Sequence, residues 1–247
     1  MMPVMAVFGA DAYTPSEIAA RVRDVGVVKA QLPWLSQAAL GVLAGAFIGL
    51  GAMMFTLVAS DASLGFAASR LLGGLVFSLG LVLVIVAGAE LFTGNNLIVM
   101  AWAGGQVSTA QLLRNWVVVC VANAVGALGL ALLVHWSGHA SLNGGAVART
   151  AVRIAAAKAE LPAFELFFRG VLCNTLVCMA VWMAMAGRSV IDKAVAIVFP
   201  ITAFVAAGFE HSIANMYFFP LAMLLGAPLT PLDLLRNLGP VIAGNLV

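Results

Sequence analysis

The 247 residues include 12 Lys and Arg and 10 Asp and Glu, so 9% of the chain is charged whereas 63% is hydrophobic. Ordinary soluble domains are about 25% charged and about 45–50% apolar. So few charges, with a net charge of +2, exclude a soluble enzyme, a disordered chain and a nucleic-acid-binding protein. Outer-membrane barrels show alternating strands of about ten residues, whereas here the apolar stretches run unbroken for about twenty or more. The composition therefore predicts an all-α polytopic membrane protein.

The chain begins with a predicted amphipathic helix. Residues 14–17, Thr-Pro-Ser-Glu, have the pattern of a capping box with proline at the first helical position. Ile18, Val22 and Val25 then follow at helical spacing. We expect this helix to lie at the cytoplasmic membrane interface, within an amino-terminal segment over residues 1–33.

Five later stretches are long and apolar enough to cross a membrane, which takes about 20 residues. They run approximately over 34–59, 71–101, 115–136, 161–186 and 194–225, within a membrane domain over 34–247. The second and fifth are too long for one span and carry polar residues at their middle. They therefore predict two helices that are broken inside the membrane.

The chain carries an internal duplication. The two long stretches share Ala-Gly-x-Glu-x₄-Asn, with Glu90 over Glu210 and Asn95 over Asn215. Two other patterns recur in the same order: Leu-Leu-Arg-Asn, with another Asn eight residues later, at 112–123 and 234–245, and Gly-Val-Leu at 41–43 and 170–172.

These matches predict two repeats of three spans, approximately 34–136 and 161–247, with the second copy inverted in the membrane. Asn123 lies early in the third span, so we expect Asn245 to lie early in a sixth span. Most of that sixth span is expected to be missing from the given chain.

Three ionisable side chains fall near the middle of the broken spans: Glu90, Glu210 and His211. Such a group costs about 2.5–3.5 kcal/mol on membrane-insertion scales. We expect the two carboxylates to accept hydrogen bonds from backbone N–H groups freed where each helix breaks. His211 is expected to be functional, because an imidazole can be neutral or cationic near pH 7 and can donate a proton.

The broken helices also predict the kind of solute. Amino termini of half-helices that face a midplane cavity supply N–H donors and partial positive charge. Thr93, Gly94 and Asn95 can form the turn in the second span, and Ser212 and Asn215 can cap the second half of the fifth. The expected solute is small and anionic, or neutral and weakly acidic.

Several segments resemble one known family. They are residues 90–93 (Glu-Leu-Phe-Thr), 208–216 (Gly-Phe-Glu-His-Ser-Ile-Ala-Asn-Met) and 187–193 (Gly-Arg-Ser-x-x-Asp-Lys). Together they closely resemble the formate/nitrite transporter family over nearly the whole chain. Residues 74–81, Gly-x-x-Phe-Ser-Leu-Gly-Leu, and the Gly-Arg-Ser loop resemble its formate-channel branch more than its nitrite or hydrosulfide branches.

The resemblance implies an aquaporin-like fold of six spans in a bacterial inner membrane, assembled as a homopentamer with a pore in each protomer. It also implies that His211 is a central pore histidine with Asn174 as a nearby polar partner, and that Leu91, Phe92 and Thr93 form a mobile cytoplasmic loop. By the same resemblance, Phe77 and Phe204 form a periplasmic hydrophobic gate, Leu81 lines a cytoplasmic slit, and Lys158 belongs to an anion-attracting vestibule.

Without the resemblance, several of these residues have ordinary interpretations. Phe77, Leu81 and Phe204 would be packing or lipid-facing residues, Asn174 a contact between helices, and Lys158 a solvated loop charge. Glu90, Glu210, Asn95 and Asn215 are expected to support the site as polar residues.

The predicted function is a channel for formate and related small monovalent anions, made pH-dependent by proton sharing with His211. No enzyme activity, cofactor or nucleic-acid partner is expected. No metal site is expected either, because His135 and His139 lie at a helix end without further ligands nearby.

Four alternatives stay open: a nitrite or hydrosulfide channel, a proton-coupled anion transporter, an aquaporin-type pore and an intramembrane enzyme using Glu210 and His211. The sequence contains no Asn-Pro-Ala repeat, the motif expected of an aquaporin-type pore.

Overall fold

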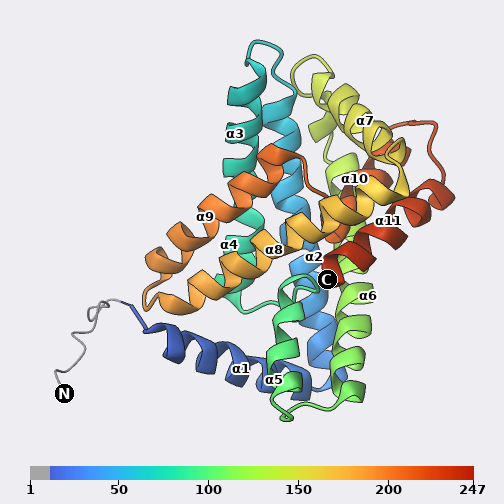
Figure 1. Cartoon of the computed structure of the whole chain (residues 1–247). Helices are drawn as coiled ribbons and strands as arrows, with labels where there is room; N and C mark the ends of the chain where they lie inside the picture. The colour runs from blue at the N-terminus through green and yellow to red at the C-terminus, as the bar shows by residue number, and fades with distance from the viewer. Residues whose placement is uncertain (1–11) are drawn as a thin grey trace.

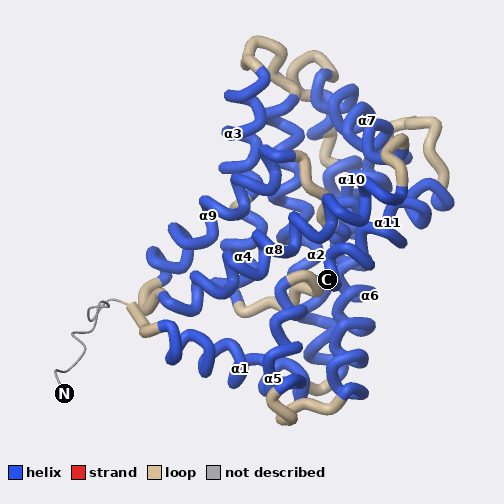
Figure 2. Tube along the Cα trace, viewed as in Figure 1, coloured by secondary structure: helices blue, strands red, loops and turns tan. Residues whose placement is uncertain are grey.

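The computed structural model describes residues 12–247, and the regular elements in that range are helices joined by loops (Figures 1 and 2). In chain order they are α1 (Pro15–Gln31), α2 (Trp34–Ala59), α3 (Phe66–Phe77), α4 (Leu79–Ala87), the 3₁₀ helix η1 (Gly94–Ile98), α5 (Val99–Ala103), α6 (Thr109–Trp136), the 3₁₀ helix η2 (His139–Ser141), α7 (Ala146–Ala159), α8 (Ala163–Ala186), α9 (Val190–Ala207), α10 (Ser212–Leu224) and α11 (Pro231–Leu246).

Helix α1 starts at the predicted capping box. The Thr14 hydroxyl accepts the Glu17 N–H, and the Glu17 carboxylate accepts the Thr14 N–H at 2.8 Å. The bonds from the Thr14 backbone and hydroxyl hold the pKa of Glu17 below its ordinary value. The amphipathic pattern is confirmed, because Ile18 and Val22 are buried. Residues 1–11 of the predicted segment lie outside the described residues.

The described chain has the helices of a multi-pass membrane protein. Within it, five helical stretches are long and apolar enough to cross a bilayer: α2, α3 with α4, α6, α8 and α9. Large apolar side chains such as Phe199 and Leu133 are exposed on their outer surfaces, as expected where lipid replaces water. The predicted first span over 34–59 coincides with α2. The third begins earlier, at Thr109, because Ser108 and Gln111 form a capping box.

Two helices break at the positions predicted from Ala-Gly-x-Glu. Helix α4 ends at Ala87 and α9 ends at Ala207, and the residues that follow, Gly88 and Gly208, have φ of 72° and 78°. This left-handed conformation strains residues that have a Cβ, so glycine suits both positions. After each break the chain resumes as helix, as η1 and α5 in the first repeat and as α10 in the second.

Each repeat consists of a short helix, a span, a broken span and a further helix. Helix α7 was not predicted, and it is the counterpart of α1: the two lie at opposite ends of the molecule (Figure 1). Helix α2 packs closely on α6, as α8 packs on α11. The two repeats meet where α3 and α4 pack on α9 and where α10 packs on α6 and α2. Asn123 and Asn245 lie equally far along α6 and α11.

Candidate functional site

A closed group of polar side chains holds the first broken helix. Buried Glu90 accepts hydrogen bonds from Lys29 Nζ at 2.7 Å and from Asn95 Nδ2 at 2.6 Å. Asn95 also donates to Asn115 Oδ1 at 2.9 Å, and Asn115 donates to the Lys29 carbonyl at 3.2 Å. We call these four residues the Lys29 cluster. It ties α1 and α6 to the break.

The second repeat contains the same arrangement. Lys158 Nζ donates to Glu210 Oε1 at 2.8 Å, and Asn215 Nδ2 donates to Glu210 Oε2 at 2.8 Å. Asn215 also donates to Asn237 Oδ1 at 2.7 Å, and Asn237 donates to the Lys158 carbonyl at 3.1 Å. These four residues are the Lys158 cluster. Lys158 is therefore an ion-paired residue of helix α7 rather than a solvated loop charge.

A separate asparagine satisfies the backbone at each break. Asn123 donates to the carbonyls of Gly41 and Glu90, at 2.7 and 2.9 Å, and accepts the Phe92 N–H at 2.9 Å. Asn245 forms the same three bonds at the second break, with the residues at the matching positions: Gly170, Glu210 and Ser212.

The expectation that the Glu90 and Glu210 carboxylates bind freed backbone N–H groups is therefore wrong. Each carboxylate binds one lysine and one asparagine side chain instead, because an ammonium compensates a buried negative charge better than a neutral amide does.

His211 lies between the second break and the first. It is the N-cap residue of α10, and its Nδ1 accepts the Ala214 N–H at 3.2 Å. Its Nε2 lies 3.1 Å from Thr93 Oγ1. Because Nδ1 acts as an acceptor, the single proton of a neutral ring is on Nε2 and faces Thr93. The imidazole caps this helix instead of Ser212 or Asn215, so the expected caps were wrong.

One phenylalanine ring stacks on the imidazole, and a second packs against the first. The ring centroids of Phe77 and Phe204 are 5.7 Å apart with their planes at 85°, an edge-to-face contact. The Phe204 ring stacks on His211 with centroids 5.9 Å apart. All three side chains are buried, so the imidazole is covered by aromatic surface.

Cavities approach this centre from both ends of the molecule. The first, of about 410 Å³, is here called the α7 vestibule; its lining residues include Phe77, Lys158, Phe204, Glu210 and His211.

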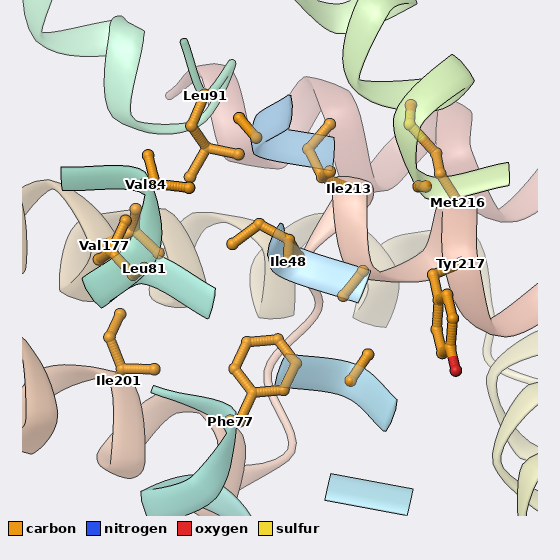
Figure 3. Close-up of a cluster of buried hydrophobic side chains, with 14 of the residues drawn as sticks. Ile48, Phe77, Leu81, Val84, Leu91, Val177, Ile201, Ile213, Met216 and Tyr217 are labelled. Carbon is orange, nitrogen blue, oxygen red and sulfur yellow. The ribbon is translucent and has the colours of Figure 1, made fainter. Parts of the chain in front are cut away.

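The second, of about 40 Å³, is the α1 pocket; its lining residues include Lys29, Leu81, Leu91 and Asn95. The two cavities share no lining residue, so buried side chains separate them. Figure 3 shows that Phe77, Leu81 and Leu91 belong to one buried apolar cluster.

The loop that follows the first break lies against α8. Leu91, Phe92 and Thr93 are all buried, and the Thr93 carbonyl lies 3.8 Å from Cys178 Sγ. Asn174 binds Cys178 and the Asn245 carbonyl, so its described hydrogen bonds lead to α8 itself and to α11 rather than to His211.

The sequence interpretation missed Lys29, Asn115 and Asn237 as site residues, and a signal for them exists. The repeated Leu-Leu-Arg-Asn places Asn115 over Asn237, and Lys29 precedes Gly41 by as many residues as Lys158 precedes Gly170. Cys178 had no such signal, because its contact with Thr93 joins distant segments.

Comparison with known proteins bears on this arrangement. Residues 16–247 match the sequence model of the family described as "Formate/nitrite transporter". The chain is 38% identical to the formate channel FocA of Haemophilus influenzae and 37% identical to formate channel FocA of Escherichia coli K12, with 96% of this chain and 90% of each relative covered.

Two solved structures are similar as well. One, described as "Pentameric formate channel with formate bound", has a TM-score of 0.81 and 35% identity, covering 86% of this chain and 91% of the other. A second, described as "FNT family ion channel", has a TM-score of 0.82 and 32% identity, covering 94% and 93%. On this evidence, the chain belongs to the formate/nitrite transporter family.

Proposed function

We propose that this protein is a channel for formate and related small monovalent anions, with a pore through each protomer of a homopentamer in a bacterial inner membrane. The observation that carries the proposal is the position of His211, a buried imidazole that borders the α7 vestibule and contacts Thr93. The similar FocA channels support the choice of solute, and the similar pentameric channel with formate bound supports both the solute and the assembly.

The aromatic contact explains why a proton is needed. Removing an anion from water without compensation costs several kcal/mol, and Phe77 and Phe204 offer it no hydrogen bond. An anion in the vestibule that shares a proton crosses as a neutral acid and avoids this cost. Phe77 and Phe204 then act as a gate on the vestibule side, and Leu81 and the loop over 91–93 form the constriction on the α1 side.

His211 supplies the hydrogen bond at the crossing point. Its Nδ1 is occupied by the Ala214 N–H, so the ring meets the carboxylate through Nε2–H in place of Thr93. The proton that neutralises the anion enters with it from the vestibule. Flux should therefore increase as the pH falls. The same arrangement supports transport rather than an enzyme reaction.

The experiment is uptake by proteoliposomes containing the purified pentamer, with formate, nitrite and hydrosulfide compared from pH 5 to pH 8 (about the range over which an imidazole titrates). We expect saturable formate uptake that is fastest at low pH. Formate uptake no faster than in empty liposomes would overturn the proposal, and faster nitrite or hydrosulfide uptake would assign the channel to that anion. Internal pH recorded in parallel distinguishes coupled proton entry from anion flux alone.

A further inference from the structure

The cationic side chains of the α7 vestibule are not equally available to an anion. Arg70, Arg153, Lys158 and Arg169 all line this cavity. Lys158 is 2.8 Å from Glu210. Arg169 is 2.9 Å from Glu165. Within residues 12–247, no carboxylate lies within 4.0 Å of Arg70 or Arg153. The uncompensated positive charge of the vestibule is therefore on these two arginines, and the charge of Lys158 is largely neutralised.

The head group of Arg70 is fixed beside the break in α9. Its Nε donates to the Ala206 carbonyl at 2.9 Å, in the last turn of that half-helix. A Cβ at Gly208 would lie 2.7 Å from Arg70 Nη2, so the guanidinium packs directly on the glycine. A positively charged side chain at the carboxyl end of a helix interacts favourably with the negative end of the helix dipole. That role uses one N–H, and within the described chain the terminal nitrogens have no hydrogen-bond partner.

Arg153 approaches the same space from α7. Its only described bonds are long ones, at 3.3 Å to the Thr150 hydroxyl and 3.5 Å to the Ala59 carbonyl. A second cavity of about 510 Å³, here called the outer hollow, adjoins this position. Arg70 and Arg153 line both the outer hollow and the α7 vestibule. They therefore stand where the two spaces meet.

The surroundings strengthen the attraction for an anion. Phe55, Phe209 and Phe218 also line the vestibule, and low-polarity walls reduce the screening of the guanidinium charges. Arg169 is close enough to Arg70 to repel it electrostatically, and a bound anion would relieve that repulsion. Asp61 lines the outer hollow and Glu210 lines the vestibule, but neither lies within 4.0 Å of Arg70.

We propose that Arg70 and Arg153 form a binding site for a small oxyanion with two coplanar oxygens, such as a carboxylate, where the outer hollow meets the α7 vestibule. A guanidinium group binds such an anion through two parallel N–H donors, one to each oxygen. An anion whose charge is on a single atom cannot accept both bonds in this geometry. This proposal rests on the proposed function, since the site would bind the anion before it reaches His211. It favours formate or nitrite over hydrosulfide, whose charge is on one atom.

The first test is transport by Arg70→Gln and Arg153→Gln variants in proteoliposomes. The half-saturating formate concentration should rise about threefold to tenfold in each and more in the double variant, while the maximal rate changes less than about twofold. The half-saturating hydrosulfide concentration should change less. Arg149→Gln is the matched control, because Arg149 is an exposed arginine of the same helix that lines only the outer hollow.

A second measurement separates this site from the proposed transport. Calorimetric titration of the detergent-solubilised pentamer with formate, and with chloride for comparison, reports binding whether or not formate crosses. Tighter formate binding by wild type than by the double variant supports the site even if uptake fails. Equal binding by both, or an equal effect of Arg149→Gln, overturns it. If Arg70→Gln does not fold, because the Ala206 carbonyl of α9 loses its hydrogen bond from Arg70, the Arg153→Gln variant at an exposed position carries the test alone.

Discussion

The Lys29 and Lys158 clusters contain the same residue types and share four bonds, although Lys29 also donates to Asn95 Oδ1 at 3.0 Å and Lys158 has no matching bond among the described residues. The neighbours of the two clusters differ more. Each has a lysine from a short helix, a buried glutamate at the break and two asparagines. Glu90 is followed by Leu91, whereas Glu210 is followed by His211. The first cluster borders a cavity of about 40 Å³ and the second borders one of about 410 Å³.

This difference distinguishes residues with a structural role from residues that act on the anion. Each repeat contains a helix that is broken in an apolar environment, and the polar cluster that occurs in both repeats holds that break. Of these two cavities, only the larger is lined by the imidazole and by Arg70 and Arg153. We therefore assign the clusters to stability and these asymmetric residues to the handling of the anion.

The largest expected effect tests whether the clusters are equivalent. In Glu90→Gln and Glu210→Gln, the new amide must turn its NH₂ group toward a donor, because both carboxylate oxygens now accept bonds from lysine or asparagine. A half-buried lysine that loses its carboxylate partner adds to the cost, so each variant should lose about 3 kcal/mol. Thermal unfolding of the detergent-solubilised protein measures the loss.

Glu165→Gln is the control for this comparison, because its partner Arg169 is partly exposed and such surface pairs contribute about 0–1 kcal/mol. Two equal losses support the structural assignment. A stable Glu90→Gln beside an unstable Glu210→Gln would show that the first cluster is not structural.

A smaller effect is expected at the asparagines that bind the backbone. Asn123→Leu leaves the Phe92 N–H and two carbonyls without partners, at a cost of about 1–3 kcal/mol. Hydrogen exchange should accelerate at residues 88–93, where the loop is held. Asn123→Asp, which keeps an acceptor for Phe92, should accelerate it less. Unchanged exchange in Asn123→Leu would contradict the role given to this side chain.

The sequence predicts where helices lie and where they break better than it predicts contacts between distant segments. The apolar run over 34–59 reproduces α2 because lipid demands continuous apolar surface, and Ala-Gly-x-Glu reproduces both breaks because glycine tolerates positive φ. Helix α7 was missed because it is short and carries Arg149, Arg153 and Lys158. It has no long apolar run to mark it.

The site was only partly predicted, because many of its contacts join segments that are far apart in the sequence. His211, Thr93, Phe77 and Phe204 do lie together, although only the resemblance named Phe77 and Phe204 as site residues. The ion pairs join residues that are far apart in the chain, such as Lys29 and Glu90, and no local period marks such contacts. The imidazole cap was missed because Ser212 and Asn215 are commoner capping residue types than histidine.

The central claim is that His211 donates a hydrogen bond to the crossing anion in addition to capping α10. His211→Asn separates the two roles, since asparagine can still accept the Ala214 N–H but is too short to place an N–H donor where Nε2 lies. His211→Phe removes both roles. The decisive measurement is formate uptake by proteoliposomes of wild type and both variants as a function of pH. The account predicts that His211→Asn forms a stable pentamer in which uptake at neutral pH falls at least about tenfold, because the anion loses its hydrogen bond at the crossing point. Wild-type uptake in that variant would contradict it.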